Sequence, residues 1–351
     1  MKTTYLLDPF QDPRWADLVD RHPRSSVFHT VAWLEALQQT YGYQPVAYAT
    51  SPSGGSLEDG LVFCRVESWI TGRRLISLPF SDHCEPLLNS ASDEPAFATA
   101  LEQTLHREKL RYIEIRPVQP FAATTDLCRP TQTYAFHQID LGPDLATLFK
   151  NCHKSSMQQK IQRAAREGLI CETGRSEALL DAFWTLLLIT RRRHGVPPQP
   201  RSWFRNLIRC FGDALQIRVA FQDRRPVASI LTLRHKDTLV CKYSCSDTRW
   251  NNLGGTQVLF WRAIEEARRD GLRVFDLGRS DSGNAGLIEF KNRWGAACST
   301  LTYVRLSAAP PAKIAAARGS GWAQRIAKAV APGVPDRLFS TIGSALYRHI
   351  A

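Results

Sequence analysis

Short runs of alternating hydrophobic and polar residues occur twice, in the same order, along this chain. In the first half they predict strands at 45–49, 60–65 and 74–78, a helix over about 95–108, and a strand at 112–116. In the second half they predict strands at 216–221, 227–233 and 238–243, a helix over about 255–270, and a strand at 273–277. Enrichment in β-branched and aromatic residues supports the strands. The repetition indicates an internal duplication.

Each copy reads as a hairpin followed by a strand–helix–strand crossover. Such a crossover makes two strands parallel and covers them with a helix. We therefore expect an α/β protein with two mixed sheets. Helices at 31–37, about 153–167 and about 177–193 precede the sheets. A boundary near Gly142–Pro143 divides the chain into domains at 1–144 and 145–308, with a tail at 309–351.

The tail predicts two short amphipathic helices. Trp322, Ile326 and Val330 share one helical face, and a second helix carries Leu338, Ile342, Leu346 and Ile350 at a spacing of four. Basic helices of this kind can lie on a membrane surface. They can equally pack on the first half of the protein itself.

Charge separates the two halves. The formal charge is −6 over residues 1–149 and +18 over 150–351, for a total of +12. A basic surface attracts polyanions such as a coenzyme, a tRNA or an anionic membrane, although a solvated basic surface is the plainer interpretation. No apolar run is long enough for a membrane span, and the N-terminus lacks the apolar core of a signal peptide. The nine cysteines form no metal-binding pattern. We expect a cytoplasmic protein without a metal, in possible peripheral contact with the inner face of the plasma membrane through 312–351.

The first candidate motif is a glycine-rich helix start. Its residues are Asn252, Leu253, Gly254, Gly255 and Thr256. The two glycines let the backbone approach a ligand, Thr256 can cap the helix, and the free N–H groups of the first turn attract an anion. A pyrophosphate fits there. An ordinary glycine-rich turn before a helix is the structural alternative.

The second motif follows the last predicted strand. Asp276, Arg279 and Ser280 open a polar, glycine-rich loop at 278–284, where open α/β sheets bind ligands. Arg279 can bind a phosphate or carboxylate, and Asp276 can transfer a proton or hold the loop in place. Lys291, within the aromatic run 288–296, is a candidate phosphate ligand or a solvated lysine beside a buried Phe290 and Trp294.

A basic helix face at Lys160, Arg163 and Arg166 is either solvated or in contact with a polyanion. Sequence patterns of hydrolases and nucleotide-binding loops do not occur, and Ser81-Asp82-His83 are too close in sequence to form a catalytic relay by pattern alone.

These motifs resemble the FemAB-type, tandem GNAT acyltransferases, including FemAB-like proteins of exopolysaccharide and exosortase systems. The similarity covers about residues 25–306 and is carried by 243–247, 252–256, 275–280 and 290–296, with 28–34 and 75–80 in the first half. It implies two tandem GNAT-like domains, with the transfer site in the second. It also implies transfer of an acyl or aminoacyl group to an amine or hydroxyl.

Two donors occur across the family, acyl-CoA and aminoacyl-tRNA. The long coiled-coil insertion that contacts tRNA in peptidoglycan-bridge members is missing from this sequence. The prediction is therefore an acyl-CoA-dependent acyltransferase acting on a cell-envelope or polysaccharide-related acceptor. One alternative is an aminoacyl-tRNA-dependent enzyme that modifies a peptidoglycan precursor. Another is a non-catalytic module that binds a lipid-linked saccharide.

Overall fold

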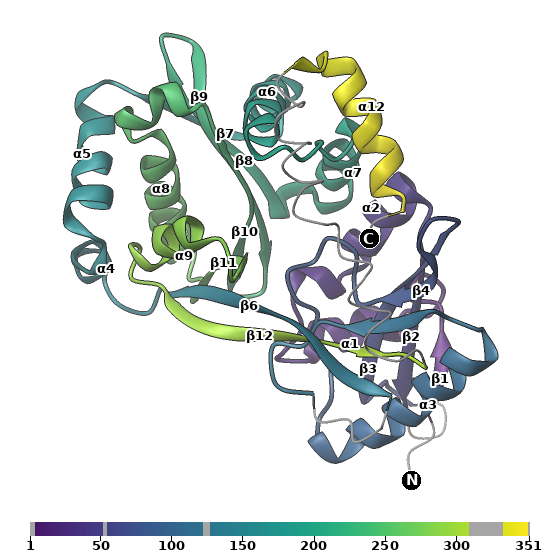
Figure 1. Cartoon of the computed structure of the whole chain (residues 1–351). Helices are drawn as coiled ribbons and strands as arrows, with labels where there is room; N and C mark the ends of the chain where they lie inside the picture. The colour runs from purple at the N-terminus through teal and green to yellow at the C-terminus, as the bar shows by residue number, and fades with distance from the viewer. Residues whose placement is uncertain (1–3, 52–54, 122–126, 309–332, 350–351) are drawn as a thin grey trace. The chain divides into compact units, whose positions relative to one another are not determined.

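A computed structural model describes residues 4–51, 55–121, 127–308 and 333–349 of the chain. It divides into two compact units (Figure 1). Unit 1 comprises Met1–Tyr134, Thr300–Gly319 and Ala345–Ala351, and unit 2 comprises Ala135–Ser299 and Ser320–Ser344. These bounds differ from the division at 144 and 308 expected from the sequence, and the expected domains stay a prediction.

Unit 1 contains a mixed sheet in the order β1-β2-β3-β4-β5-β12. Its strands are β1 (Thr4–Leu7), β2 (Gln44–Thr50), β3 (Asp59–Ser68), β4 (Gly72–Ile76), β5 (Tyr112–Ile115) and β12 (Ala297–Leu306). Only β4 and β5 form a parallel pair among these neighbours, as the predicted crossover requires. The helices are α1 (Arg14–Arg21), α2 (Val31–Tyr41) and α3 (Glu94–Arg107). α3 makes the crossover and buries Phe97 and Leu101 against Ile113 and Phe63 of the sheet.

The strands of unit 2 lie in the order β6-β11-β10-β9-β8-β7 and include both parallel and antiparallel pairs. Its strands are β6 (Cys128–Asp140, in this unit from Ala135), β7 (Ile170–Gly174), β8 (Leu215–Gln222), β9 (Arg225–His235), β10 (Thr238–Ser246) and β11 (Val274–Asp281). β10 and β11 are parallel and are joined through α8 (Gly255–Arg269). The predicted repeat of a hairpin and a strand–helix–strand crossover is thus confirmed in both halves.

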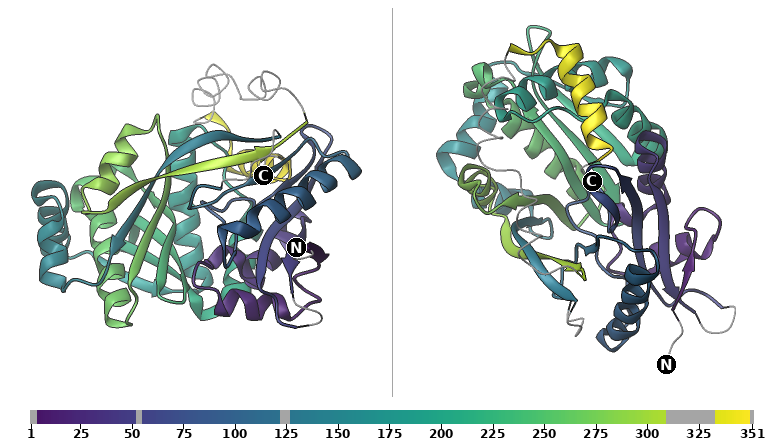
Figure 2. Two further views of the ribbon diagram at one scale, coloured as in Figure 1. Left: turned by 90° about the horizontal axis from the view of Figure 1, so that it is seen from below. Right: turned by 45° about the vertical axis from the view of Figure 1, so that its right-hand side comes forward.

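Helices cover both faces of the unit 2 sheet (Figures 1 and 2). One face carries α4 (Leu145–Asn151), α5 (Gln159–Arg166), α8 and α9 (Ala285–Asn292); the other carries α6 (Glu177–His194) and α7 (Arg201–Phe211). The predicted helix at 153–167 begins with a π-helical turn at Lys154–Gln158. The predicted strand at 273–277 extends to Asp281, so Arg279 and Ser280 lie on a strand and not in the expected loop.

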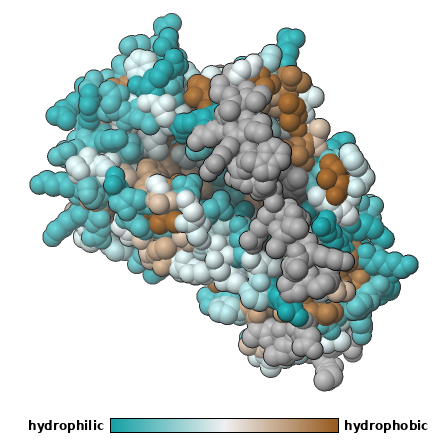
Figure 3. Space-filling view, viewed as in Figure 1, coloured by the Kyte–Doolittle hydropathy of each residue, from teal (hydrophilic) through white to brown (hydrophobic). Residues whose placement is uncertain are grey.

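The C-terminal helix α12 (Asp336–Tyr347) packs through a different face from the one the sequence suggested. Leu338 and Ile342 are 53% and 44% exposed, whereas Phe339 is buried. In unit 2, Arg192 of α6 forms an ion pair with Asp336 at 2.5 Å and places its guanidinium 4.9 Å from the centre of the Phe339 ring. Figure 3 shows hydrophobic residues at the surface over α12. The predicted first tail helix and Ile350 lie outside the described residues.

Candidate functional site in unit 2

The parallel strands β10 and β11 pair only at their beginnings. Thr238, Leu239 and Val240 pair with Val274, Phe275 and Asp276. Beyond this point β10 continues to Ser246 and β11 to Asp281. Main-chain groups that leave a ladder need other partners. The point where the strands separate is therefore a place where a bound molecule can pair with the backbone.

A β-bulge lies immediately after this point on β10. Cys241 pairs with Thr232 and Tyr243 pairs with Leu231, so Lys242 is the additional residue. Bulges redirect the backbone and are common beside active sites. Sequence analysis missed this feature because the strand contains no glycine or proline that would have indicated it. Tyr243, the next residue, is fixed by hydrogen bonds from Trp203 Nε1 (2.8 Å) and to Gln199 Oε1 (2.6 Å).

The glycine-rich helix start is packed tightly against its own unit. Gly254 has a φ of 79°, and a Cβ atom there would collide with the main-chain oxygen of Lys160 on α5. A Cβ on Gly255 would lie 3.1 Å from that of Ala228 on β9. Both glycines thus have a structural reason to be small. The role of this helix start in binding phosphate remains a prediction.

The other three predicted residues of this motif, Asn252, Leu253 and Thr256, differ in their exposure and in their position relative to α8. Asn252 is exposed, while the Leu253 side chain belongs to the hydrophobic core. Thr256 is not the helix cap that the sequence suggested: α8 begins at Gly255, Gly254 is its N-cap, and no side chain caps it. The glycine takes the left-handed conformation at the cap, which leaves Thr256 within the first turn.

The residues predicted on β11 and α9 are brought together. Asp276 is buried and its Oδ1 accepts a hydrogen bond from the Gly278 N–H at 2.6 Å. Lys291 is also buried, and its Nζ donates to the main-chain oxygens of Gly278 (2.8 Å) and Arg279 (3.1 Å). These contacts hold the outer end of β11 in shape. Lys291 is therefore not the solvated lysine of the structural alternative, because it contacts the protein's own backbone in a buried position. Its role as a phosphate ligand stays a prediction.

Ser280 and Arg279 follow on the same strand. Ser280 is 2% exposed, and its Oγ has no hydrogen-bond partner within the described residues. Burying an unpaired hydroxyl is unfavourable, so such a group commonly meets a ligand or water. Arg279 is half-buried, and the bond from Lys291 fixes its carbonyl.

An aromatic cluster links the two groups of predicted residues. Phe260 of α8 stacks on Trp294 at 5.4 Å between ring centres and meets Phe290 edge-on at 5.7 Å. Phe275 of β11 lies 5.9 Å from Phe260. Trp294 is therefore a core residue as predicted, whereas Phe290 is only half-buried and packs against the core.

His137 on β6 was not singled out from the sequence. It is fully buried, its Nε2 lies 3.0 Å from Asn292 Oδ1, and burial lowers its pKa, so the ring is neutral at pH 7. It fixes the end of α9 next to Lys291. A single histidine in a predicted strand gives no sequence signal for this contact.

Unit 1 has a position equivalent to the separation of β10 from β11, and side-chain and main-chain groups of unit 1 fill it. The parallel pair β4–β5 ends at Ile76 and Glu114, as β10–β11 ends at Val240 and Asp276. Just beyond, Arg116 donates to the main-chain oxygens of Leu78 (2.5 Å) and Ser81 (3.2 Å). In unit 1 the Arg116 side chain therefore occupies the position beyond the end of the parallel pair. In unit 2 the strands β10 and β11 separate at the equivalent position. This difference favours unit 2 as the site of chemistry.

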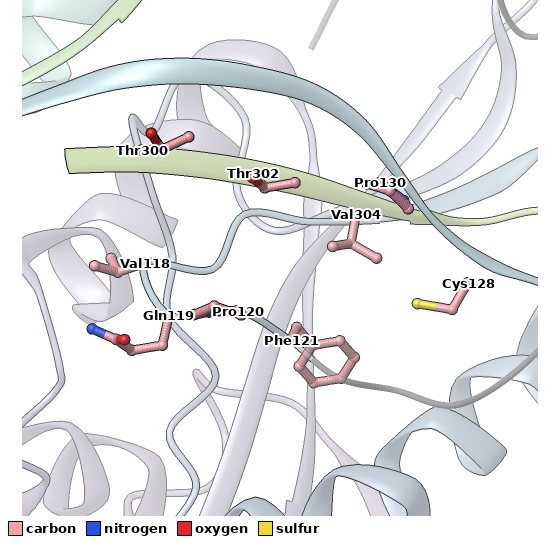
Figure 4. Close-up of a pocket in the computed structure, with 9 residues that line it drawn as sticks. All are labelled: Val118, Gln119, Pro120, Phe121, Cys128, Pro130, Thr300, Thr302 and Val304. Carbon is pink, nitrogen blue, oxygen red and sulfur yellow. The ribbon is translucent and has the colours of Figure 1, made fainter.

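Unit 1 also contains a cavity of about 380 Å³. Figure 4 shows its lining, which includes Phe121, Cys128 and Thr302. Burial raises the pKa of the Cys128 thiol to about 11, so this thiol stays protonated and unreactive at neutral pH. The cavity contains none of the residues predicted from the sequence.

No group of three or more His, Cys, Asp or Glu side chains in the described part of the chain could hold a metal ion. No helix there is long and apolar enough to cross a membrane.

Comparison with known proteins defines the class. Residues 152–292 match the family described as acetyltransferase (GNAT) domain, and this segment contains β7–β11 and α5–α9 of unit 2. Residues 152–292 thus form a GNAT-type domain. The strands of unit 1 follow the same order, so the chain has the fold seen in solved tandem GNAT proteins, in agreement with the sequence resemblance.

Several solved structures have a similar fold at low sequence identity. A structure of FemX has a TM-score of 0.66 and 13% identity, covering 85% of this chain and 96% of that one. A tandem GNAT protein from the clavulanic acid biosynthesis pathway has a TM-score of 0.54 and 12% identity, with coverage of 88% and 99%. The C-terminal domain of a putative lysylphosphatidylglycerol synthetase from Agrobacterium fabrum has a TM-score of 0.54 and 15% identity, with coverage of 87% and 92%. No curated protein matches the sequence significantly.

Proposed function

We propose that unit 2 transfers an acyl group from acyl-CoA to an amine or hydroxyl of a cell-envelope or polysaccharide-related acceptor. The observation that carries this proposal is the separation of β10 from β11 after Val240 and Asp276, with a bulge at Lys242. Main-chain N–H groups near the bulge are suited to binding the thioester carbonyl oxygen as it gains negative charge.

The donor is oriented by the start of α8. Its pyrophosphate is placed at the N–H groups near Gly254 and Gly255, where the helix dipole favours an anion. Gly254 is held against α5, whose Lys160 adds a positive charge close by, with its Nζ 3.4 Å from the Asn251 oxygen. The tight packing makes the helix start rigid, which preserves the direction of its N–H groups.

The acceptor enters beside the outer end of β11. Arg279 binds its anionic part, and the Ser280 hydroxyl donates a hydrogen bond to it. Lys291 keeps the Arg279 backbone in place. The acceptor nitrogen or oxygen attacks the acyl carbon, the C–S bond breaks, and the proton lost by the acceptor ends on the sulfur of CoA. Asp276 takes that proton in transit or, through its bond to Gly278, orients the strand.

A panel of radiolabelled acyl-CoA donors with amine and hydroxyl acceptors tests the proposal. Transfer by the wild type and its loss in Arg279→Ala, with an unchanged melting temperature, are expected. Arg234→Ala, which removes a half-exposed arginine of β9, serves as a matched control. Failure of every acyl-CoA to bind would end the CoA version, and full activity of Arg279→Ala would remove the assigned site. Binding of a lipid-linked saccharide without any turnover would favour the non-catalytic module instead.

The second candidate donor is aminoacyl-tRNA, with a peptidoglycan precursor as acceptor. The basic side of α5, with Arg163, Arg166 and Lys160, supports it, as does the likeness in fold to FemX. Nucleic acid bound by several cations dissociates steeply as salt rises. Salt-sensitive co-purification with tRNA, lost in an Arg163→Ser/Arg166→Ser variant, would distinguish this donor from CoA.

We also propose peripheral contact of the tail, 312–351, with an anionic membrane. The exposed Leu338 and Ile342 of α12 support it, because they form an apolar stripe that the packing of Phe339 leaves at the surface. Leu338→Ser/Ile342→Ser should weaken sedimentation with anionic vesicles. Unchanged sedimentation would exclude these two residues as the contact.

A further inference from the structure

The hairpin between β3 and β4 of unit 1 ends in two large exposed apolar residues. Trp69 is 87% exposed and Ile70 is 52% exposed. The turn is ordered by Ser68, whose Oγ accepts hydrogen bonds from the N–H groups of Ile70 and Thr71, both at 3.1 Å. Two such side chains side by side in water are unfavourable in a free protein. Their exposure on a well-formed turn points to a surface that covers them.

The C-terminal end of the chain braces this hairpin. The main-chain oxygen of His349 accepts hydrogen bonds from Thr71 Oγ1 (2.9 Å) and from the Arg74 guanidinium (2.7 Å). The His349 ring meets the Trp69 ring edge-on at 5.9 Å, and its Nδ1 lies 3.1 Å from Ser68 Oγ. The tip is thus held in position before any partner binds, which reduces the entropy lost on binding.

Exposed arginines lie on the segments next to the hairpin tip. Arg111 donates to the main-chain oxygen of Thr71 at 3.2 Å and is exposed, and Arg73 is 52% exposed on β4. Arg348 is exposed and directly precedes His349. The acid of the hairpin, Glu67, is paired with Arg73 at 3.3 Å. The charge around the tip is therefore positive.

We propose that this hairpin tip docks on the surface of an anionic phospholipid membrane. Trp69 would lie among the headgroups, Ile70 would enter the acyl boundary, and Arg73, Arg111 and Arg348 would contact lipid phosphates. A stable protein interface requires a far larger surface, on the order of 1,200 Å² or more. A tip of two exposed apolar side chains with arginines on the neighbouring segments suits a membrane surface better. The proposal uses different residues from the tail stripe and does not depend on the acyl-transfer chemistry.

Sedimentation of the full chain with vesicles tests the proposal. Vesicles of equal parts phosphatidylglycerol and phosphatidylcholine should bind the wild type, and salt should weaken the binding. Trp69→Ser/Ile70→Ser should lower the partition coefficient about tenfold or more, and Arg111→Ser about fivefold. Leu6→Ser, which removes a 39% exposed leucine of β1 in the same unit, should have no effect. Brominated lipids should quench tryptophan fluorescence in the wild type and less in the double variant.

Two results would overturn the proposal. One is equal binding of the wild type and the double variant, and the other is equal binding to vesicles of phosphatidylcholine alone. A change of oligomeric state in the double variant, with vesicle binding intact, would identify a second copy as the partner. Trp69→Phe, which exchanges one aromatic ring for another, should lose part of the lipid quenching and keeps the test valid if the double variant misfolds. Acyl transfer to a water-soluble acceptor should be unchanged in the double variant, which separates this proposal from the catalytic one.

Discussion

At residue scale, single positions in unit 2 carry both packing and candidate chemistry. Gly254 turns the chain from a 3-10 segment (Thr248–Leu253) into α8 and lies directly on the carbonyl of Lys160. The Lys291 ammonium group donates hydrogen bonds to two main-chain carbonyl oxygens of β11. Both residues were selected from the sequence as ligand contacts. Their packing roles depend on α5 and on the extended end of β11, which the local motifs do not reveal.

Replacing Gly254 by alanine should destabilise unit 2 by about 2 kcal/mol or more. The new Cβ would meet the Lys160 oxygen, and a φ of 79° strains any side chain. Gly283→Ala is the control, because nothing lies within 4 Å of its Cβ position. Urea unfolding measures both variants. An equal effect of the two changes would contradict the close approach between α5 and α8.

Lys291→Met should cost about 2 kcal/mol of unfolding free energy, since it leaves two carbonyls without their buried donor. It should also lower transfer activity through displacement of Arg279, with little change in affinity for the donor. Lys154→Met removes an exposed lysine and should do neither. If Lys291 instead binds a donor phosphate, Lys291→Met will raise the donor KM, and the positioning role will be refuted.

At the scale of elements, a buried charge network joins β5 to β12 in unit 1. Glu114 pairs with Arg116 at 2.9 Å and with Arg305 at 2.6 Å. Burial alone would raise the pKa of Glu114, but the two guanidinium groups outweigh it and hold the pKa below its usual value. Removing one member of a buried network leaves the other charges uncompensated.

Glu114→Gln should therefore destabilise unit 1 by about 3 kcal/mol at neutral pH. A carboxylate with a lowered folded pKa contributes its full stabilisation above the unfolded pKa of about 4.3 and loses it as pH falls through the folded value. The difference between wild type and variant should shrink as pH falls below about 4. Asp20→Asn, an exposed change in the same unit, should show no such trend. Parallel stability curves for wild type and Glu114→Gln would contradict the network.

The sequence predicted helices and strands that have a strong hydrophobic pattern, and it missed several others, some of them short. The paired strands and the two crossover helices follow from runs of β-branched residues and helical spacing, and the structure confirms them. α7 was missed although Trp203, Leu207 and Phe211 have helical spacing. α9 was missed because it is short and contains Gly286. The bulge at Lys242 depends on pairing with β9 and on the loss of β11, so no local pattern indicates it.

At the scale of the whole molecule, the duplication predicted from the sequence is correct, but the units exchange segments. The sheet of unit 1 ends with β12, whose Val304–Leu306 pair with Ile113–Ile115. The sheet of unit 2 begins with β6, which precedes the predicted boundary. Hydrophobic periodicity identifies a strand but not its neighbour, because strand pairing is a long-range contact.

The fragment 1–144 should not unfold cooperatively on its own. It lacks β12, which supplies Arg305 to Glu114 and the Tyr303 hydroxyl to the Asp82 oxygen at 2.7 Å. Circular dichroism melting measures this, with the full chain as reference. Adding a peptide of residues 297–308 should restore a cooperative transition. Melting of the bare fragment at the temperature of the full chain would contradict the role of β12.

The placement of β12 also constrains how this gene can be rearranged. A recombination breakpoint between the two repeats would deliver a first repeat without β12, the strand that pairs with its β5. Shuffling of intact modules would thus require exchange of both repeats together. The two halves would then be inherited together, even though they still show the same order of strands and helices.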